Sequence, residues 1–107
     1  MLSVVIPAYN EARRIAPTLD RVLAHLRRRG GRSEILVVDD GSTDGTAAEV
    51  RCRADSGSAV RLIQLPRNTG KGAALRAGVA ASRGRRVLFT DADLSTPIED
   101  LARLEYE

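Results

Sequence analysis

The sequence has almost none of the features that stabilise small secreted proteins or anchor proteins in membranes. Its 107 residues include one cysteine, Cys52, so an internal disulfide cannot form. No apolar run approaches the roughly 20 residues of a membrane-spanning helix, and the first apolar stretch lacks the basic flank of a signal peptide. These absences exclude disulfide scaffolds and membrane-spanning proteins. They favour a reducing compartment, so we expect a cytoplasmic protein.

Aromatic side chains and lysine are also scarce. The chain has two tyrosines, one phenylalanine and no tryptophan, and its 17 basic residues include a single lysine, Lys71. The net charge of +3 would favour contact with the negatively charged backbone of a nucleic acid. Too few rings are present to form a stacking surface for bases, however. We therefore predict no nucleic-acid partner.

Two arginine clusters, at 27–29 and at 83–86, carry much of the positive charge. Arginines in the last turn of a helix complement the helix dipole and are commonly solvated. The same residues could instead contact anionic lipid headgroups, which would place the protein peripherally at the inner face of the membrane. The sequence leaves both interpretations open.

Four short apolar runs predict the strands of an α/β protein. They lie at 4–6, 35–38, 60–65 and 87–89, and three of them are nearly continuous and rich in β-branched residues, as in strands buried on both faces. The third run alternates with polar residues, so we expect it near an edge of the sheet. The helix patterns between and after the runs begin before Ile15, near Thr46, at Lys71 and at Thr96.

The alternation of strands and helices predicts a mostly parallel sheet with helices on both faces, a three-layer αβα architecture. We expect Pro17 near the first turn of its helix, and Thr46 with Glu49 as a capping box that opens the second helix. Ligands of such sheets bind beyond the carboxyl ends of the strands, which is where the chemistry is to be sought.

Five of the aspartates follow two strands directly, at positions 39, 40, 44, 91 and 93. Crowded carboxylates repel unless a cation or hydrogen-bond donors offset them. Asp91 and Asp93 are two residues apart, so in extended backbone both can face one divalent ion. Mg²⁺ or Mn²⁺ at such a pair would keep room for substrate phosphates. The alternative is that these residues are ordinary acids of turns.

Three further motifs lie at predicted strand ends. Asp40 could accept a nucleobase N–H or serve a turn, and 68–72, which contains Lys71, could hold an anion at a helix start or only connect elements. In the segment that follows the first strand, Tyr9 could lie against a base or sugar and Glu11 could hold a ribose hydroxyl. Neither a P-loop nor a G-x-G-x-x-G fingerprint is present.

Together these motifs resemble the N-terminal half of glycosyltransferase family 2 enzymes, which have the GT-A, Rossmann-like nucleotide-diphospho-sugar transferase fold. The matching segments are VVIPAYNE at 4–11, VVDDGSTDGT at 37–46, NTGKG at 68–72 and DAD at 91–93. The segment TDADLSTP at 90–97 looks most like the dolichyl- or polyprenyl-phosphate glucosyltransferases. Haloacid-dehalogenase phosphatases and receiver domains carry their acidic pairs after the first strand. In this chain the acidic pairs follow the second and fourth predicted strands, so these two families fit less well.

The resemblance implies a site and a reaction. The nucleotide-sugar pocket would be lined by Pro7, Tyr9, Glu11, Val38, Asp40, Lys71 and Asp91, with Asp91 and Asp93 binding Mg²⁺ or Mn²⁺. The enzyme would transfer a hexose with inversion from a UDP- or GDP-sugar to an acceptor such as a polyprenyl or dolichyl phosphate. Serine at position 95 replaces a glutamine that is common in related mannose synthases.

The length of the chain qualifies this assignment. The family's catalytic domains are longer, so we interpret 1–107 as the donor-binding half, with acceptor recognition and any general base beyond Glu107. The alternative is a nucleotide-binding half-domain without turnover. We also expect the strand that ends before Asp91 to have an unpaired edge, through which copies of the chain would form a homo-oligomer.

Overall fold

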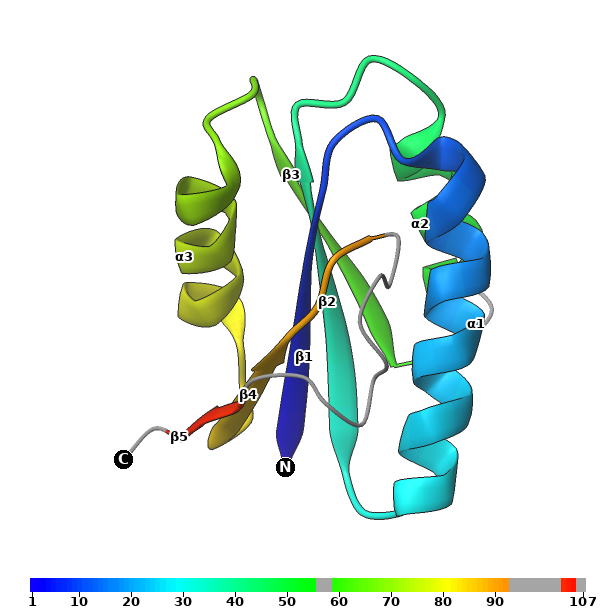
Figure 1. Cartoon of the computed structure of the whole chain (residues 1–107), viewed down its shortest axis with the longest axis vertical. Coiled ribbons are helices and arrows are strands. Elements are labelled where there is room, and N and C mark those ends of the chain that lie inside the picture. Colours follow the sequence, from blue (N-terminus) through cyan, green and yellow to red (C-terminus); the bar gives the residue numbers. More distant parts are fainter. Residues whose placement is uncertain (56–58, 93–102, 106–107) are drawn as a thin grey trace.

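A computed structural model describes residues 1–55, 59–92 and 103–105 of the chain. Asp93 and the helix predicted to begin at Thr96 lie outside these residues. The elements, shown in Figure 1, are β1 (Leu2–Ala8), α1 (Ala12–Arg29), β2 (Ser33–Asp40), α2 (Thr46–Asp55), β3 (Val60–Leu65), α3 (Lys71–Ala81), β4 (Arg86–Phe89) and β5 (Arg103–Glu105).

The strands form one sheet in the order β3-β2-β1-β4-β5. The pairs β1–β2, β2–β3 and β1–β4 are parallel, and β5 is antiparallel to β4. The predicted parallel sheet is confirmed, and so is the place of β3 at an edge. The expected unpaired edge of β4 is wrong, because Arg103–Glu105 pairs with Arg86–Leu88 there. Association of two copies through that edge therefore loses its structural basis.

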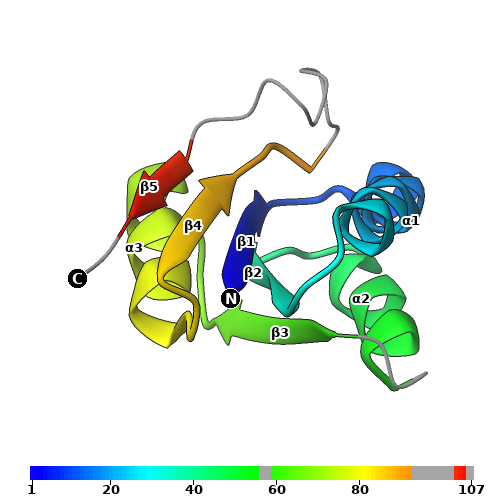
Figure 2. The same cartoon turned by 90° about the horizontal axis from the view of Figure 1, so that it is seen from below.

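Helices cover both faces of the sheet, as predicted. In Figure 2 α1 and α2 lie on one side of the strands and α3 on the other. Because neighbouring side chains of a strand point to opposite faces, Val4 and Ile6 pack beneath α1 and α2, whereas Val5 and Val38 pack beneath α3. The two buried faces explain why β1 and β2 are almost continuously apolar.

The starts of α1 and α2 lie close to their predicted places, but the predicted capping box is wrong. Pro17 lies at an exposed position in the second turn of α1, which begins at Ala12. Thr46 is the first residue of α2 and makes no capping box with Glu49. Its Oγ1 accepts a hydrogen bond from the Glu11 amide (2.9 Å) instead, and its own amide donates to Asp44 Oδ1 (2.9 Å).

A buried polar network joins the strands at the end of the sheet opposite the predicted site. Glu34 is buried on β2, and its Oε2 accepts hydrogen bonds from Ser3 Oγ (2.6 Å) and the Arg83 amide (2.6 Å). Its Oε1 accepts one from Arg61 Nη1 (2.9 Å). Burial alone would raise the pKa of Glu34, but these donors outweigh it and hold the pKa below the ordinary value.

Candidate nucleotide-diphosphate site

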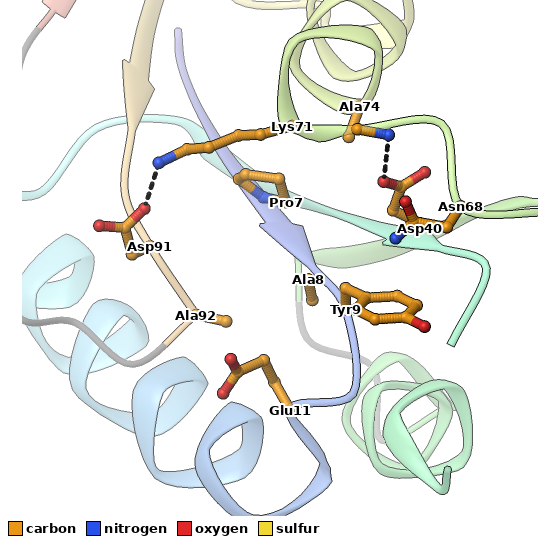
Figure 3. A pocket seen from close by; sticks show the side chains of 11 residues that line it. Pro7, Ala8, Tyr9, Glu11, Asp40, Asn68, Lys71, Ala74, Asp91 and Ala92 are labelled. Carbon is orange, nitrogen blue, oxygen red and sulfur yellow. Dashed lines mark hydrogen bonds and ion pairs between the residues drawn. The ribbon is translucent and has the colours of Figure 1, made fainter. Parts of the chain in front are cut away.

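A cavity of about 440 Å³ opens beyond the carboxyl ends of the parallel strands. Its volume lies within the range of small-molecule sites, roughly 300–1,000 Å³. The ends of β1, β2 and β4, the loop before α3 and the first turns of α3 all contribute to it (Figure 3). The lining residues are Pro7, Ala8, Tyr9, Glu11, Asp40, Asn68, Gly70, Lys71, Ala74, Asp91 and Ala92.

Most of the residues predicted for the pocket do line it. The exception is Val38, which is fully buried beneath α3 and belongs to the core. The lining residues that sequence reasoning did not single out are mostly small, namely Ala8, Gly70, Ala74 and Ala92. Asn68, which belongs to the motif at 68–72, lines the cavity as well.

Asp40 is almost fully buried at the end of β2, and its carboxylate supports the loop before α3. Oδ1 accepts hydrogen bonds from the Thr69 amide (2.8 Å) and Thr69 Oγ1 (2.7 Å), and Oδ2 accepts one from the Gly70 amide (2.9 Å). Burial raises the pKa of Asp40, but these donors hold it below the ordinary value, so the group is ionised at neutral pH.

Asp39 at the end of β2 and Asp44 in the loop after it also accept hydrogen bonds from groups of the protein. Asp39 Oδ1 accepts a hydrogen bond from the Ser42 amide (3.0 Å). Asp44 accepts from Thr46 through Oδ1 and from the Ala12 amide through Oδ2 (3.2 Å), and bonds from Thr46 are the main reason why its pKa lies below the ordinary value. At positions 39 and 44 the interpretation as acids of turns is the better one.

The loop that carries Tyr9 and Glu11 is tied to the loop after β2. Asn10 has a positive φ of 53°, its amide donates to Ser42 Oγ (2.9 Å), and its Oδ1 accepts from the Thr43 amide (2.9 Å). Tyr9 is 46% exposed, so its ring is available to a ligand, and Figure 3 shows it beside Asp40 at the cavity. The Glu11 carboxylate lies on the side of Ala92.

Asp91 follows β4, and the residues before and after it, Thr90 and Ala92, make hydrogen bonds to β1 and α1. The Thr90 amide donates to the Val5 carbonyl of β1 (3.2 Å), and the hydroxyl of Thr18 on α1 donates to the Ala92 carbonyl. These bonds fix the backbone on both sides of Asp91. Its carboxylate is half-exposed at the cavity and accepts a hydrogen bond from Lys71 Nζ at 2.7 Å.

The carboxylate of Asp91 has the chemistry of a ligand for a hard divalent ion. It already holds a cation, the Lys71 ammonium, and the cavity beside it leaves room for phosphate oxygens and water. Within the part of the chain that the structure describes, no three His, Cys, Asp or Glu side chains cluster as a complete metal site. Asp93, the second predicted ligand, lies outside those residues.

The profile of glycosyl transferase family 2 matches residues 3–105 of this sequence. The chain belongs to that family. A dolichyl-phosphate beta-glucosyltransferase of Trichomonas vaginalis is 46% identical over 106 residues, which cover 94% of this chain and 32% of that protein. The human dolichyl-phosphate beta-glucosyltransferase is 42% identical over 97% of this chain. This chain therefore spans about a third of the length of these relatives.

Comparison with solved structures supports the same family. A mannosyltransferase of Pyrobaculum calidifontis, in complex with GDP-Man and Mn²⁺, superposes with a TM-score of 0.75 at 35% identity, over 86% of this chain and 27% of its own. The likeness places the chain in the GT-A fold, as predicted. In the described part of the chain no helix is long and apolar enough to cross a membrane.

Proposed function

We propose that this chain binds the donor of a metal-dependent, inverting glycosyltransferase that moves a hexose from a UDP- or GDP-sugar to a polyprenyl or dolichyl phosphate. The observation that carries the proposal is the cavity at the strand ends, where Tyr9, Asp40 and Asp91 converge from three different strands or their ends. The exposed ring of Tyr9 suits the flat face of a base, and the buried carboxylate of Asp40 suits the polar edge of that base. The accessible carboxylate of Asp91 suits a metal ion that binds the diphosphate.

Tyr9 and Asp40 would hold the nucleoside. Tyr9 offers an exposed ring for the flat face of a base or ribose. An ionised carboxylate has about four acceptor positions, and Asp40 uses three of them within the protein, two on Oδ1 and one on Oδ2. The remaining position on Oδ2 could accept an N–H of the base. The lowered pKa supports this role, since an ionised Asp40 accepts hydrogen bonds and does not donate them.

Asp91 and Asp93 would hold Mg²⁺ or Mn²⁺, which when bound stabilises the negative charge of the departing diphosphate. The hydrogen bonds from Thr18 to the Ala92 carbonyl and from the Thr90 amide to the Val5 carbonyl keep the backbone on both sides of Asp91 in place. The carboxylate therefore faces the cavity before any ligand binds. The Mn²⁺ in the complex of the Pyrobaculum mannosyltransferase supports a divalent ion in this fold.

The acceptor would be an anionic lipid phosphate. The curated relatives are named dolichyl-phosphate beta-glucosyltransferases, which supports this class of acceptor. A phosphate oxygen is already ionised at neutral pH, so attack on the anomeric carbon needs no strong general base. The groups that recognise the acceptor would belong to the part of the relatives that this chain does not match.

A nucleotide-binding half-domain without turnover is the second candidate. It is favoured by one observation, namely that the chain matches about a third of the length of its relatives. In that case the same pocket would bind nucleoside diphosphates, but no sugar would be transferred.

One experiment tests both candidates. UDP, GDP and their glucose and mannose derivatives are titrated calorimetrically into the chain with Mn²⁺, and transfer to a short polyprenyl phosphate is assayed in parallel. The donor-binding role requires a metal-dependent affinity for a nucleoside diphosphate that Asp91→Asn weakens by at least tenfold. Binding without transfer favours the half-domain, and no binding of any of these nucleotides would overturn both candidates.

A further inference from the structure

The ion pair between Lys71 and Asp91 joins two elements that line the cavity. Lys71 is the first residue of α3, and Asp91 follows β4. In Figure 3 the Lys71 side chain extends past Pro7 to reach the carboxylate. The Nζ–Oδ1 distance is 2.7 Å, that of a direct hydrogen-bonded ion pair. The ammonium thus takes up one carboxylate oxygen that a metal ion would need.

The exposure of both partners makes this pair easy to exchange. The side chain of Lys71 is 65% exposed and that of Asp91 is 48% exposed. Ion pairs in contact with water contribute little free energy, because the charges are also well solvated when apart. A divalent ion has twice the charge of the ammonium, and Mn²⁺ or Mg²⁺ prefers carboxylate oxygens as ligands. The pair is therefore weak enough to yield to a metal ion.

We propose that Lys71 is a displaceable cation of the donor site, which pairs with Asp91 when no metal ion is bound there and moves to the donor diphosphate when metal and donor bind. The proposal rests on the donor-binding role proposed above. The first turn of α3 contains no acidic residue, and Gly70 in front of it lines the cavity, so this wall of the pocket favours an anion. A long, flexible lysine at this position reaches Asp91 and can turn back to a phosphate beside its own helix.

This exchange links the two ligands. A metal ion that takes the Oδ1 oxygen of Asp91 without a diphosphate must displace Lys71 and leave the ammonium beside a divalent charge without an anion to neutralise it. When the diphosphate is present, the same ammonium gains a phosphate partner. Metal and diphosphate should therefore each raise the affinity for the other, and part of that coupling should depend on the charge of Lys71.

Lys71→Met removes the charge and keeps a side chain of similar reach. We expect Mn²⁺ alone to bind this variant about three to ten times more tightly than the original chain at low ionic strength, because a competing cation is gone. We expect UDP or GDP, whichever binds the original chain, to bind the variant about ten times more weakly in the presence of Mn²⁺. Free Mn²⁺ is measured from its electron paramagnetic resonance signal, and nucleotide binding by calorimetry.

Two control variants separate this effect from general electrostatics. Arg76→Met removes one positive charge from an exposed position of the same helix, outside the cavity lining, and should leave the Mn²⁺ affinity within twofold. Lys71→Arg keeps the charge and should bind Mn²⁺ alone as weakly as the original chain. In an Asp91→Asn background, Lys71→Met should no longer raise the Mn²⁺ affinity, since the two residues then have no shared contact.

The outcomes distinguish this proposal from the donor-binding role. If the original chain binds a nucleoside diphosphate with Mn²⁺ but Lys71→Met binds Mn²⁺ no more tightly, the displaceable cation is wrong and the donor site stands. An equal gain in Arg76→Met, or a gain that persists with Asp91→Asn, would also overturn the exchange at Asp91. If no nucleotide binds while Mn²⁺ alone follows the predicted order, the competition at Asp91 is supported and the donor role fails.

Discussion

The Gly70 amide donates a hydrogen bond of 2.9 Å to Asp40 Oδ2, so that two residues 30 positions apart meet at the floor of the candidate site. The same carboxylate binds the amide and the hydroxyl of Thr69. Asp40 therefore determines where the loop before α3 lies, and with it the position of Lys71. Of the two roles that the sequence left open for Asp40, the structural one is therefore present: the carboxylate builds the pocket.

Asp40→Asn should impair both functions of this residue. The amide NH₂ group that replaces one oxygen cannot accept a hydrogen bond, so either the Thr69 or the Gly70 amide loses its acceptor. We expect the free energy of unfolding to fall by about 1–3 kcal/mol, as for other buried donors without a partner. We expect the affinity for the free nucleoside to fall at least tenfold. Urea unfolding and calorimetric titration measure the two effects.

Thr69→Val is the matched control for Asp40→Asn. It removes only the hydroxyl bond to Oδ1 and leaves both amide donors and the carboxylate in place. Since Thr69 is not among the residues that line the cavity, the nucleoside affinity should stay within twofold while the stability falls slightly. Unchanged nucleoside affinity in Asp40→Asn would show that the carboxylate does not contact the base.

Glu34 should make the stability depend on pH below its ordinary pKa of 4.5. Burial raises the pKa of this carboxyl, but hydrogen bonds from Ser3, Arg83 and Arg61 lower it further than burial raises it. Between the lowered pKa and 4.5 the unfolded chain binds more protons than the folded one, so stability is present above pH 4.5 and is lost as the pH falls through the folded value. Thermal unfolding between pH 3 and 7 measures this loss.

Glu34→Gln tests whether that carboxylate is responsible. The variant should be less stable than the original chain at pH 7, by about 1–3 kcal/mol, because the ionised acceptor of three donors is gone. Its stability should fall less between pH 5 and pH 3. Equal pH slopes in the two proteins would assign the acid sensitivity to other carboxyls, such as Asp40.

The architecture could be predicted from the sequence because the strands obey a simple rule. Side chains of β1 and β2 are buried on both faces, so their runs are continuously apolar, and the polar positions of β3 mark an edge. The strand ends also indicated the site, since parallel strands bring their carboxyl ends to one edge. Val38 was misplaced because the sequence does not say how far along β2 the helix α3 extends. Val38 lies one pleat deeper than Asp40 and is covered by α3.

Other features depend on contacts that no local pattern contains. β5 is too short for a strand signal and pairs with β4 across a long connection. Glu34 and Arg61 look like ordinary polar residues, and only the register between β2 and β3 brings them together. The crowded acidic residues at the end of β2 and in the loop after it called for a cation or hydrogen-bond donors to offset them. The structure supplies donors of the protein itself, some local, such as the Ser42 amide, and some distant, such as the Ala12 and Gly70 amides.

Asp44→Ala should loosen the starts of two helices at once. Asp44 accepts the Ala12 amide at the start of α1 and the Thr46 amide at the start of α2, and both donors lose this partner in the variant. We expect a lower melting temperature and faster hydrogen exchange at both amides. Asp20→Ala is the control, because it removes an acid whose contact with Arg53 is exposed. Equal effects of the two substitutions would contradict the capping role.

Gly78→Val should be the most damaging single change in the helix that carries Lys71. A Cβ at Gly78 would collide with Val5 Cγ1 and lie 3.1 Å from Val38 Cγ2, so α3 can approach the sheet this closely only with glycine there. A larger side chain must push the helix away from β1 and β2, at a cost of about 1–3 kcal/mol or more.

Gly72→Ala tests whether that cost comes from contact with the sheet or from glycine as such. The new methyl group would meet only the end of the Arg76 side chain, at 3.6 Å, and alanine favours the helical backbone. Stability should therefore be unchanged or slightly raised in urea unfolding.

Gly78→Val should also weaken nucleotide binding, because α3 carries Lys71 and Ala74 into the cavity. A Gly78→Val protein as stable as the original chain would show that α3 does not pack as closely as described.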